Sequence, residues 1–208
     1  MLTGIALLTL ALAAALLPAQ RDYKRMLAYS SMEHMSLIAL GASIGTPLAR
    51  AALLLHIAGH GLAKAVAFCA SGHILRLTRT TLIGRVRGLL ARLPWLGGVL
   101  GLAVVTLLGF PPFSLFASEL GIVRARFAAG MGGAVTAALL LVLVAFTALA
   151  LRTARMLLGP SPAAGTYSPD HTAAWPLVLG LTACAALGIA LGPLADLMHE
   201  AAPAIGGR

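Results

Sequence analysis

Three ionisable side chains stand four residues apart in an apolar segment of the chain. The segment LLLHIAGHGLAKAVAF, at positions 53–68, contains His56, His60 and Lys64. On an α-helix, residues i, i+4 and i+8 lie on one face, so the three side chains would form a line about 12 Å long. Histidine titrates near neutral pH, and it can accept a proton on one ring nitrogen and release it from the other. Together with trapped water, the line is predicted to relay protons along the helix.

This line has two other interpretations. The side chains could satisfy neighbouring carbonyls or extend to the membrane surface, but three in register inside an apolar segment are rare and costly, which favours a function. Two histidines four residues apart can also share a metal ion. No nearby Cys, Asp or Glu completes such a site in the sequence, so we predict no bound metal.

A carboxylate follows a predicted helix break in FPPFSLFASELGIV, at positions 110–123. Pro111 and Pro112 cannot donate backbone hydrogen bonds, which prevents a continuous helix. Inside a membrane, such a break persists only where protein or a water-filled cavity satisfies the freed carbonyls, and transporters place ion sites there. Glu119 is therefore predicted to carry protons. The alternative is a carboxylate at the membrane edge that pairs with Arg124 or Arg126.

Other charged residues flank the second apolar stretch. Lys24 lies in QRDYKRMLAYSS, between two apolar stretches, where it reads equally well as a marker of topology. Glu33 and His34 are adjacent and should point to different faces, with His34 lining the same cavity as the histidine line and Glu33 contacting a neighbouring subunit. Cys69 and Cys184 lack metal-ligand spacing, and both are predicted to be small core residues.

The elements that position these residues must lie in a membrane. The chain has 208 residues, of which 60% are hydrophobic and 10% are charged, and its mean hydropathy is +0.95. Soluble domains carry about 25% charged residues, so this chain cannot cover its apolar surface in water. The net charge of +9 does not indicate nucleic-acid binding, because the arginines lie between apolar stretches rather than on one basic face.

Apolar stretches of membrane-spanning length run at 2–18, 27–45, 50–75, 95–127, 131–151 and 174–193. They predict an all-α polytopic membrane bundle of about six transmembrane helices, one of them broken by Pro111–Pro112. With six crossings, most basic residues fall in the first, third and fifth loops, namely Arg21, Lys24, Arg25, Arg76, Arg79, Arg85, Arg87, Arg92, Arg152 and Arg155. The positive-inside rule places these loops in the cytoplasm and the N-terminus outside.

Three motifs carry a resemblance to a known family: RDYKRMLAYSSMEHMSLIALG, LLLHIAGHGLAKAVAFCASGHIL and LLGFPPFSLFASEL. They resemble the antiporter-like, proton-translocating membrane subunits of respiratory complex I. The segments SSMEHM and PPFSLFASE are more similar to the equivalent subunit of membrane-bound nickel–iron hydrogenases, of the hydrogenase-4 and formate hydrogenlyase type. The resemblance implies two inverted helical repeats, each with one broken helix, and a hydrophilic axis that carries protons.

The resemblance assigns proton-relay roles to six residues, namely His56, His60, Lys64, Glu119, Lys24 and His34. The first three match the central relay helix, Glu119 matches the second broken helix at the exit half-channel, and the last two flank the channel. Residues 1–208 are then a single membrane domain that corresponds to the C-terminal part of such a subunit, with the second broken-helix repeat at about 27–151. The first broken helix of the family has no counterpart in this sequence.

The predicted function is that of a membrane subunit of a redox-driven proton pump, multi-pass in the bacterial cytoplasmic membrane. Its partners would be other membrane and peripheral subunits of a hydrogenase or complex I-like assembly. The chain lacks nucleotide, flavin, haem and iron–sulfur motifs, so nickel–iron and iron–sulfur centres are expected in partner subunits and no cofactor in this one. The alternatives are a subunit of a multi-subunit sodium–proton antiporter and a non-conducting membrane scaffold.

Overall fold

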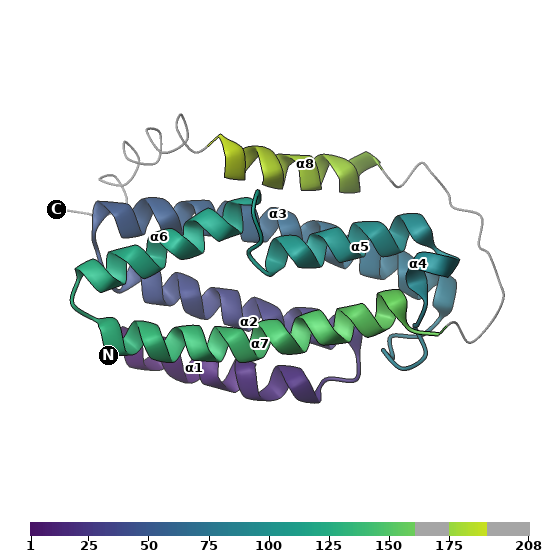
Figure 1. Ribbon diagram of the computed structural model, residues 1–208, viewed down its shortest axis with the longest axis horizontal. Coiled ribbons are helices and arrows are strands. Elements are labelled where there is room, and N and C mark those ends of the chain that lie inside the picture. The colour runs from purple at the N-terminus through teal and green to yellow at the C-terminus, as the bar shows by residue number, and fades with distance from the viewer. Residues whose placement is uncertain (161–174, 191–208) are drawn as a thin grey trace.

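The computed structural model describes residues 1–160 and 175–190, and these ranges are built from helices and short connections. The helices are α1 (Leu2–Leu16) with the 3₁₀ turn η1 (Leu17–Ala19), α2 (Tyr23–Ala42), α3 (Pro47–Thr78), α4 (Leu89–Arg92), α5 (Pro94–Leu107), α6 (Ser114–Ala128), α7 (Gly132–Leu158) and α8 (Trp175–Ile189). All but the short α4 run along one direction in an elongated bundle, with α5 and α6 placed end to end (Figure 1). The predicted all-α bundle is confirmed.

The helices match the predicted crossings of a membrane. The segment Leu2–Ala19 and the helices α3 and α7 are each long and apolar enough to span a bilayer, and α5 and α8 are shorter apolar helices. The pair α5 and α6 occupies the predicted fourth crossing, 95–127, and the break between them contains Pro111 and Pro112. The predicted last loop and last span fall partly on residues 161–174 and 191–193, which lie outside the described ranges.

The break between α5 and α6 follows directly from its sequence. The helical hydrogen bond to the carbonyl of Leu107 would come from residue 111, and proline has no N–H to donate. Gly109 takes the left-handed backbone conformation, with φ +66°, which suits glycine because it has no Cβ. Helix α6 restarts at Ser114. The break therefore leaves free backbone groups in the middle of the bundle.

Helix α3 is the central helix of the bundle and packs against α2, α5, α6 and α8. Gly59 allows the closest of these approaches, because a Cβ at this position would collide with the side chain of Ser114 on α6. Gly188 on α8 likewise faces the backbone of the break, where Pro112 and Ser114 leave no room for a side chain. Glycines thus bring α6 and α8 against the central helix, close to the break.

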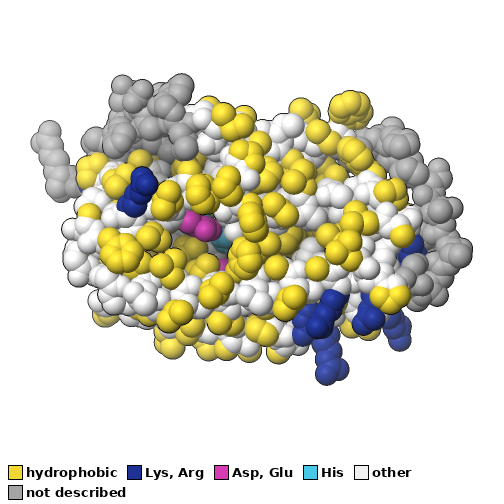
Figure 2. Space-filling model, in the orientation of Figure 1, with side chains coloured by type: hydrophobic (Ala, Val, Ile, Leu, Met, Phe, Trp, Pro, Cys, Tyr) yellow, Lys and Arg dark blue, Asp and Glu magenta, His cyan; other side chains and the backbone are white. Residues whose placement is uncertain are grey.

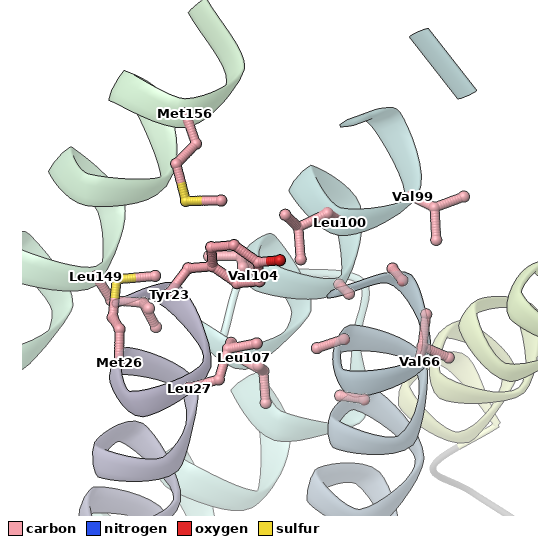
Figure 3. Packing of buried hydrophobic residues seen from close by; sticks show 14 of the residues in the cluster. Tyr23, Met26, Leu27, Val66, Val99, Leu100, Val104, Leu107, Leu149 and Met156 are labelled. Carbon is pink, nitrogen blue, oxygen red and sulfur yellow. The ribbon is translucent and has the colours of Figure 1, made fainter. Parts of the chain in front are cut away.

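Apolar side chains from α2, α3, α5 and α7 form the main core on one side of the break (Figure 3). Leu27 on α2, Val66 on α3, Leu100 on α5 and Met156 on α7 are all buried there. Tyr23 adds a polar contact, since its hydroxyl donates to the carbonyl of Ser71 at 3.2 Å. This core fixes how α2 and α5 lie against the central helix.

The two cysteines differ in environment. Cys184 on α8 is buried, and its thiol lies 3.8 Å from the carbonyl oxygen of Gly59. Cys69 is exposed on α3, so the prediction that both are core residues was wrong for Cys69. A thiol is apolar enough to stand on a helix face that meets lipid, and burial cannot be read from residue type alone in a membrane protein.

Candidate functional site

Three helices bring ionisable and hydroxyl side chains together in the middle of the bundle. We call this group the polar axis; it consists of Ser30, Glu33 and His34 on α2, His56, His60 and Lys64 on α3, and Ser118 and Glu119 on α6. All are buried except Glu119, whose side chain is 26% exposed. The three residues on α2 have i, i+3 and i+4 spacing, which places them on one face.

Two histidines and a serine form a hydrogen-bonded chain across the three helices. Nδ1 of His34 lies 3.2 Å from Nε2 of His56, and Nδ1 of His56 lies 3.0 Å from the hydroxyl oxygen of Ser118. The Ser118 hydroxyl also lies 2.9 Å from the carbonyl oxygen of Leu115, to which it donates. Both ring nitrogens of His56 therefore have partners, one from each neighbouring helix.

The third histidine stacks beside this chain. The ring centroids of His34 and His60 are 4.5 Å apart, and those of His56 and His60 are 6.2 Å apart with the ring planes only 15° from parallel. Nδ1 of His60 is buried and has no hydrogen-bond partner among the described residues. The prediction from spacing placed His56 and His60 on one face; the structure adds His34, from another helix, in contact with both rings.

Lys64 continues the axis toward the start of α2. Its ammonium group donates to the carbonyl of Leu27 at 2.6 Å and to the hydroxyl of Ser30 at 2.5 Å. Glu33 interacts electrostatically with Lys64 and with Glu119. The expectation that Glu33 contacts a neighbouring subunit is corrected here, because its side chain is only 5% exposed within this chain. The buried face of α2 is wide enough to include both Glu33 and His34, although they are adjacent in sequence.

Glu119 closes the axis at the helix break. Its Oε1 lies 4.0 Å from Nδ1 of His34, and this is the one acid–base pair within that distance among residues 1–160 and 175–190. The carboxylate also rests against Gly109, where an added Cβ would lie 2.7 Å from Oε2. Arg126 instead donates to the carbonyl of Leu40 at 3.2 Å. Figure 2 shows acidic side chains in a hollow in the middle of an otherwise apolar face.

The structure does not join Lys24 to these residues. It lies in the first turn of α2, one turn before Leu27, and its backbone N–H donates to the cap residue Asp22 at 2.8 Å. Among the described residues, no hydrogen bond links its side chain to the polar axis. Conversely, Ser30 and Ser118 were not predicted from the sequence. Ser30 stands four residues before His34, and Ser118 directly precedes Glu119. These positions in the sequence could have indicated that both serines lie near the ionisable residues.

The axis also contains atoms that suit a cation. One ligand atom each from His34, His56 and Glu119 fall within 4.8 Å of one another. The prediction of no bound metal rested on residues near in sequence, whereas the fold brings the carboxylate of Glu119 from another helix. The facing nitrogens of His34 and His56 are bonded to each other, so the arrangement seen here is a hydrogen-bonded network.

The described part of the chain is a helical bundle with a broken helix and a buried line of histidine, lysine and glutamate side chains. The chain belongs to a known family of membrane proteins: residues 1–147 match the family described as "NADH:quinone oxidoreductase/Mrp antiporter, TM". It is therefore a multi-pass membrane protein of the antiporter-like type, and the family resemblance is confirmed.

Individual relatives come from several kinds of assembly. The chain is 39% identical over 128 residues to the "Hydrogenase-4 component F homolog" of Methylacidiphilum infernorum, covering 62% of this chain and 27% of that one. It is 35% identical over 108 residues to one of the subunits of the Na(+)/H(+) antiporter of Alkalihalophilus pseudofirmus, covering 52% and 22%. Respiratory complex I from Thermus thermophilus contains a chain with a TM-score of 0.87 and 28% identity, covering 99% of this chain and 44% of that one. This chain thus spans less than half the length of each.

Proposed function

We propose that this chain carries protons through the membrane as a subunit of a redox-driven pump in the bacterial cytoplasmic membrane. Partner subunits, of the hydrogenase or complex I type, would hold the nickel–iron and iron–sulfur centres and perform electron transfer. The observation that carries the proposal is the hydrogen-bonded chain from Ser118 through His56 to His34, which engages both nitrogens of a buried imidazole. The relatives in hydrogenase and complex I assemblies support the redox coupling.

The direction of these hydrogen bonds fixes how a proton would move. Because the Ser118 hydroxyl donates to Leu115, its oxygen accepts from Nδ1–H of His56. A neutral His56 then has a bare Nε2, which accepts from Nδ1–H of His34. A proton added at Nε2 of His34 and passed from its Nδ1 to Nε2 of His56 leaves His34 in its other tautomer and His56 as an imidazolium. His56 must then release a proton, and the rings must reset, before the next transfer.

We place the excess proton in transit on His34, because this ring contacts both other rings of the axis and an acidic side chain. Its ring centroid lies 5.3 Å from that of His56 and 4.5 Å from that of His60. Oε1 of Glu119 lies 4.0 Å from its Nδ1, and an ionised Glu119 would offset the positive charge of an imidazolium. The helix that follows the break thus supplies the counter-charge.

The charges of Lys64 and Glu33 would change the free energy of proton transfer between His34 and His56. Opposite charges attract strongly in a medium of low dielectric constant, so a charge gained by Lys64 favours an ionised Glu33 nearby. A change of charge at Lys64 would thereby alter the charge of Glu33, which also interacts with Glu119 at the other end of the axis. This coupling is the kind of link through which events in a partner protein could drive proton release.

The test uses the assembly purified from its native membrane through a tag on this chain and reconstituted into vesicles. We expect Lys64→Ala and Glu119→Gln each to lower proton uptake per electron by at least about 100-fold, the lower end of the roughly 10²–10⁴-fold contribution of a proton-transfer group. Electron transfer and subunit composition are measured in parallel. Cys69→Ala, on the exposed face of α3, is the matched control. Unchanged proton pumping in both variants would contradict the proposal and would favour the alternative, a non-conducting membrane scaffold.

A second candidate, a subunit of a multi-subunit sodium–proton antiporter, is supported by the 35% identity to a component of such an antiporter. It needs no oxidoreductase partner. In the same vesicles without an electron donor, sodium added to one side would then collapse an imposed pH gradient. Purification with antiporter subunits alone, together with this sodium response, would replace the redox-driven proposal.

A further inference from the structure

Five arginines surround one cavity at the end of the bundle opposite the N-terminus. The cavity has a volume of about 310 Å³ and is lined by Arg21, Leu82, Ile83, Gly84, Arg85, Arg87, Arg152 and Arg155. We call it the arginine pocket. Its walls come from the α1–α2 connection, the α3–α4 connection and the last turns of α7. Lys and Arg side chains gather at this end in Figure 2.

Backbone hydrogen bonds hold two walls of the pocket together. The amide of Tyr23 donates to the carbonyl of Thr81 at 3.0 Å, and the amide of Ile83 donates to the carbonyl of Arg21 at 2.9 Å. The hydroxyl of Thr81 also donates to the carboxylate of Asp22. The two connections, about sixty residues apart in sequence, are therefore joined, and the backbone that carries Arg21, Arg85 and Arg87 is held in place before any ligand arrives.

The third wall is fixed as well. The guanidinium of Arg152 donates to the carbonyl of Pro18 at 2.5 Å, which ties the end of α7 to the end of α1. The side chain of Arg87 lies against Gly159, where an added Cβ would stand 3.3 Å from that of Arg87. The lining arginines thus come from three segments that have separate anchors.

The described residues that line the pocket carry charge of one sign. Each lining arginine is positively charged at any physiological pH, and no carboxylate is among the described residues that line the cavity. Like charges this close repel one another, so an anion that enters lowers the energy of all of them. Guanidinium groups bind phosphate oxygens through paired hydrogen bonds, which makes phosphate the best-matched anion.

We propose that the arginine pocket binds the phosphate of an anionic phospholipid headgroup. Two observations point to a lipid as the source of the phosphate. The pocket lies at the ends of membrane-spanning helices, where the surface of the bilayer meets the protein, and it opens on the cytoplasmic side that the positive-inside rule assigns. Basic pockets at this level are where headgroups of anionic lipids bind.

The test is native mass spectrometry of the full-length protein in detergent with added phosphatidylglycerol, phosphatidylcholine or inorganic phosphate. We expect retained phosphatidylglycerol, with weaker retention of phosphatidylcholine. Arg85→Gln combined with Arg87→Gln should weaken phosphatidylglycerol binding on the order of tenfold or more, since each basic residue near an anionic surface contributes to attraction. The matched control is Arg25→Gln combined with Arg76→Gln, which removes the same charge from exposed positions at the same end.

Each outcome decides for or against the proposal. Loss of phosphatidylglycerol in the pocket variant alone supports it, with Arg85→Lys combined with Arg87→Lys restoring part of the binding. Equal losses in both variants would mean diffuse surface charge and would overturn it. Displacement of the lipid by millimolar inorganic phosphate would assign the pocket to free phosphate instead. An assembled complex whose pocket excludes lipid because an acidic partner protein fills it would also overturn the proposal. Circular dichroism of each variant verifies that it is folded.

Discussion

The polar axis and the arginine pocket hold their charges in different ways. In the axis, several groups have a particular hydrogen-bond partner on another helix, as His56 has in His34 and Ser118. In the pocket, five arginines line one cavity at the end of the bundle. The axis is buried in a medium of low dielectric constant, where an unpaired group is costly. The pocket has access to water and salt, where single charges contribute little.

This contrast indicates where the chain tolerates change. A buried network loses stability or function when one member is altered, because its partners are left without hydrogen bonds. A surface cluster shares its role among several residues, so the loss of one is absorbed by the rest. Single substitutions should therefore have large effects at the axis and small effects at the ends of the helices.

The largest effect is expected at Gly109, beside the carboxylate of Glu119. Gly109→Ala carries a left-handed backbone penalty of roughly 1–2 kcal/mol. Its new Cβ would also stand 2.7 Å from Oε2 of Glu119, and the carboxylate, at the end of a flexible side chain, would move aside. The unfolding free energy should fall by about the backbone penalty, and the displaced carboxylate should slow proton uptake. Thermal unfolding in detergent and proton uptake in vesicles measure the two effects.

The matched control is Gly45, in the connection between α2 and α3. It has a similar left-handed backbone, with φ +74°, but no atom lies within 4 Å of an added Cβ. Gly45→Ala therefore carries the backbone penalty alone and should leave proton uptake unchanged. If the two variants were equally unstable and equally active, the close contact at Glu119 would have no part in holding the axis.

The fold was largely predictable because the membrane restricts what an apolar stretch can form. Runs of sufficient length had to be helices, and Pro111–Pro112 had to break one of them. The end with most of the arginines followed from their distribution along the chain. Spacing within one helix also predicted the shared face of His56 and His60. Each of these inferences needs only residues that are near in sequence.

Contacts between helices were much harder to predict. The sequence does not say which face of α2 meets α3, so the burial of Glu33 and the role of Ser30 beside Lys64 were missed. Ser118 is an ordinary hydroxyl residue until α6 places it 3.0 Å from His56. Cys69 shows the reverse case, an apolar residue that packing leaves outside. Such details depend on glycines such as Gly59, whose close approach sets the position of a whole helix.

An intermediate effect is expected at Ser118, which orients the ring of His56. Ser118→Ala leaves Nδ1 of His56 without an acceptor, and the ring is no longer held in one tautomer. A lost hydrogen bond of this kind corresponds to about a three- to tenfold lower rate of proton uptake. Ser36→Ala is the control, because within the described part of the chain the Ser36 hydroxyl bonds only the carbonyl of Met32 on its own helix, at 2.7 Å. Equal rates in both variants would remove Ser118 from the relay.

The smallest effect is expected at Asp22, which caps α2 beside the arginine pocket. Its carboxylate accepts hydrogen bonds from the amides of Lys24 at 2.8 Å and Arg25 at 3.0 Å and from the hydroxyl of Thr81. Partial burial acts to raise the pKa of Asp22, but these hydrogen bonds and the charge of Arg25 outweigh it, and the pKa lies below its usual value.

A lowered pKa in the folded state gives a stabilisation that is present above the ordinary aspartate pKa of about 3.9 and disappears as the pH falls through the lower folded value. Asp22→Asn keeps a capping oxygen but not the charge. It should lower the unfolding free energy by roughly 0.5–1 kcal/mol near pH 7, and the difference from wild type should vanish as the pH falls below the lowered pKa of Asp22. Thermal unfolding across this range measures it. A difference that stays constant with pH would mean that the charge of Asp22 contributes nothing and that the cap acts through geometry alone.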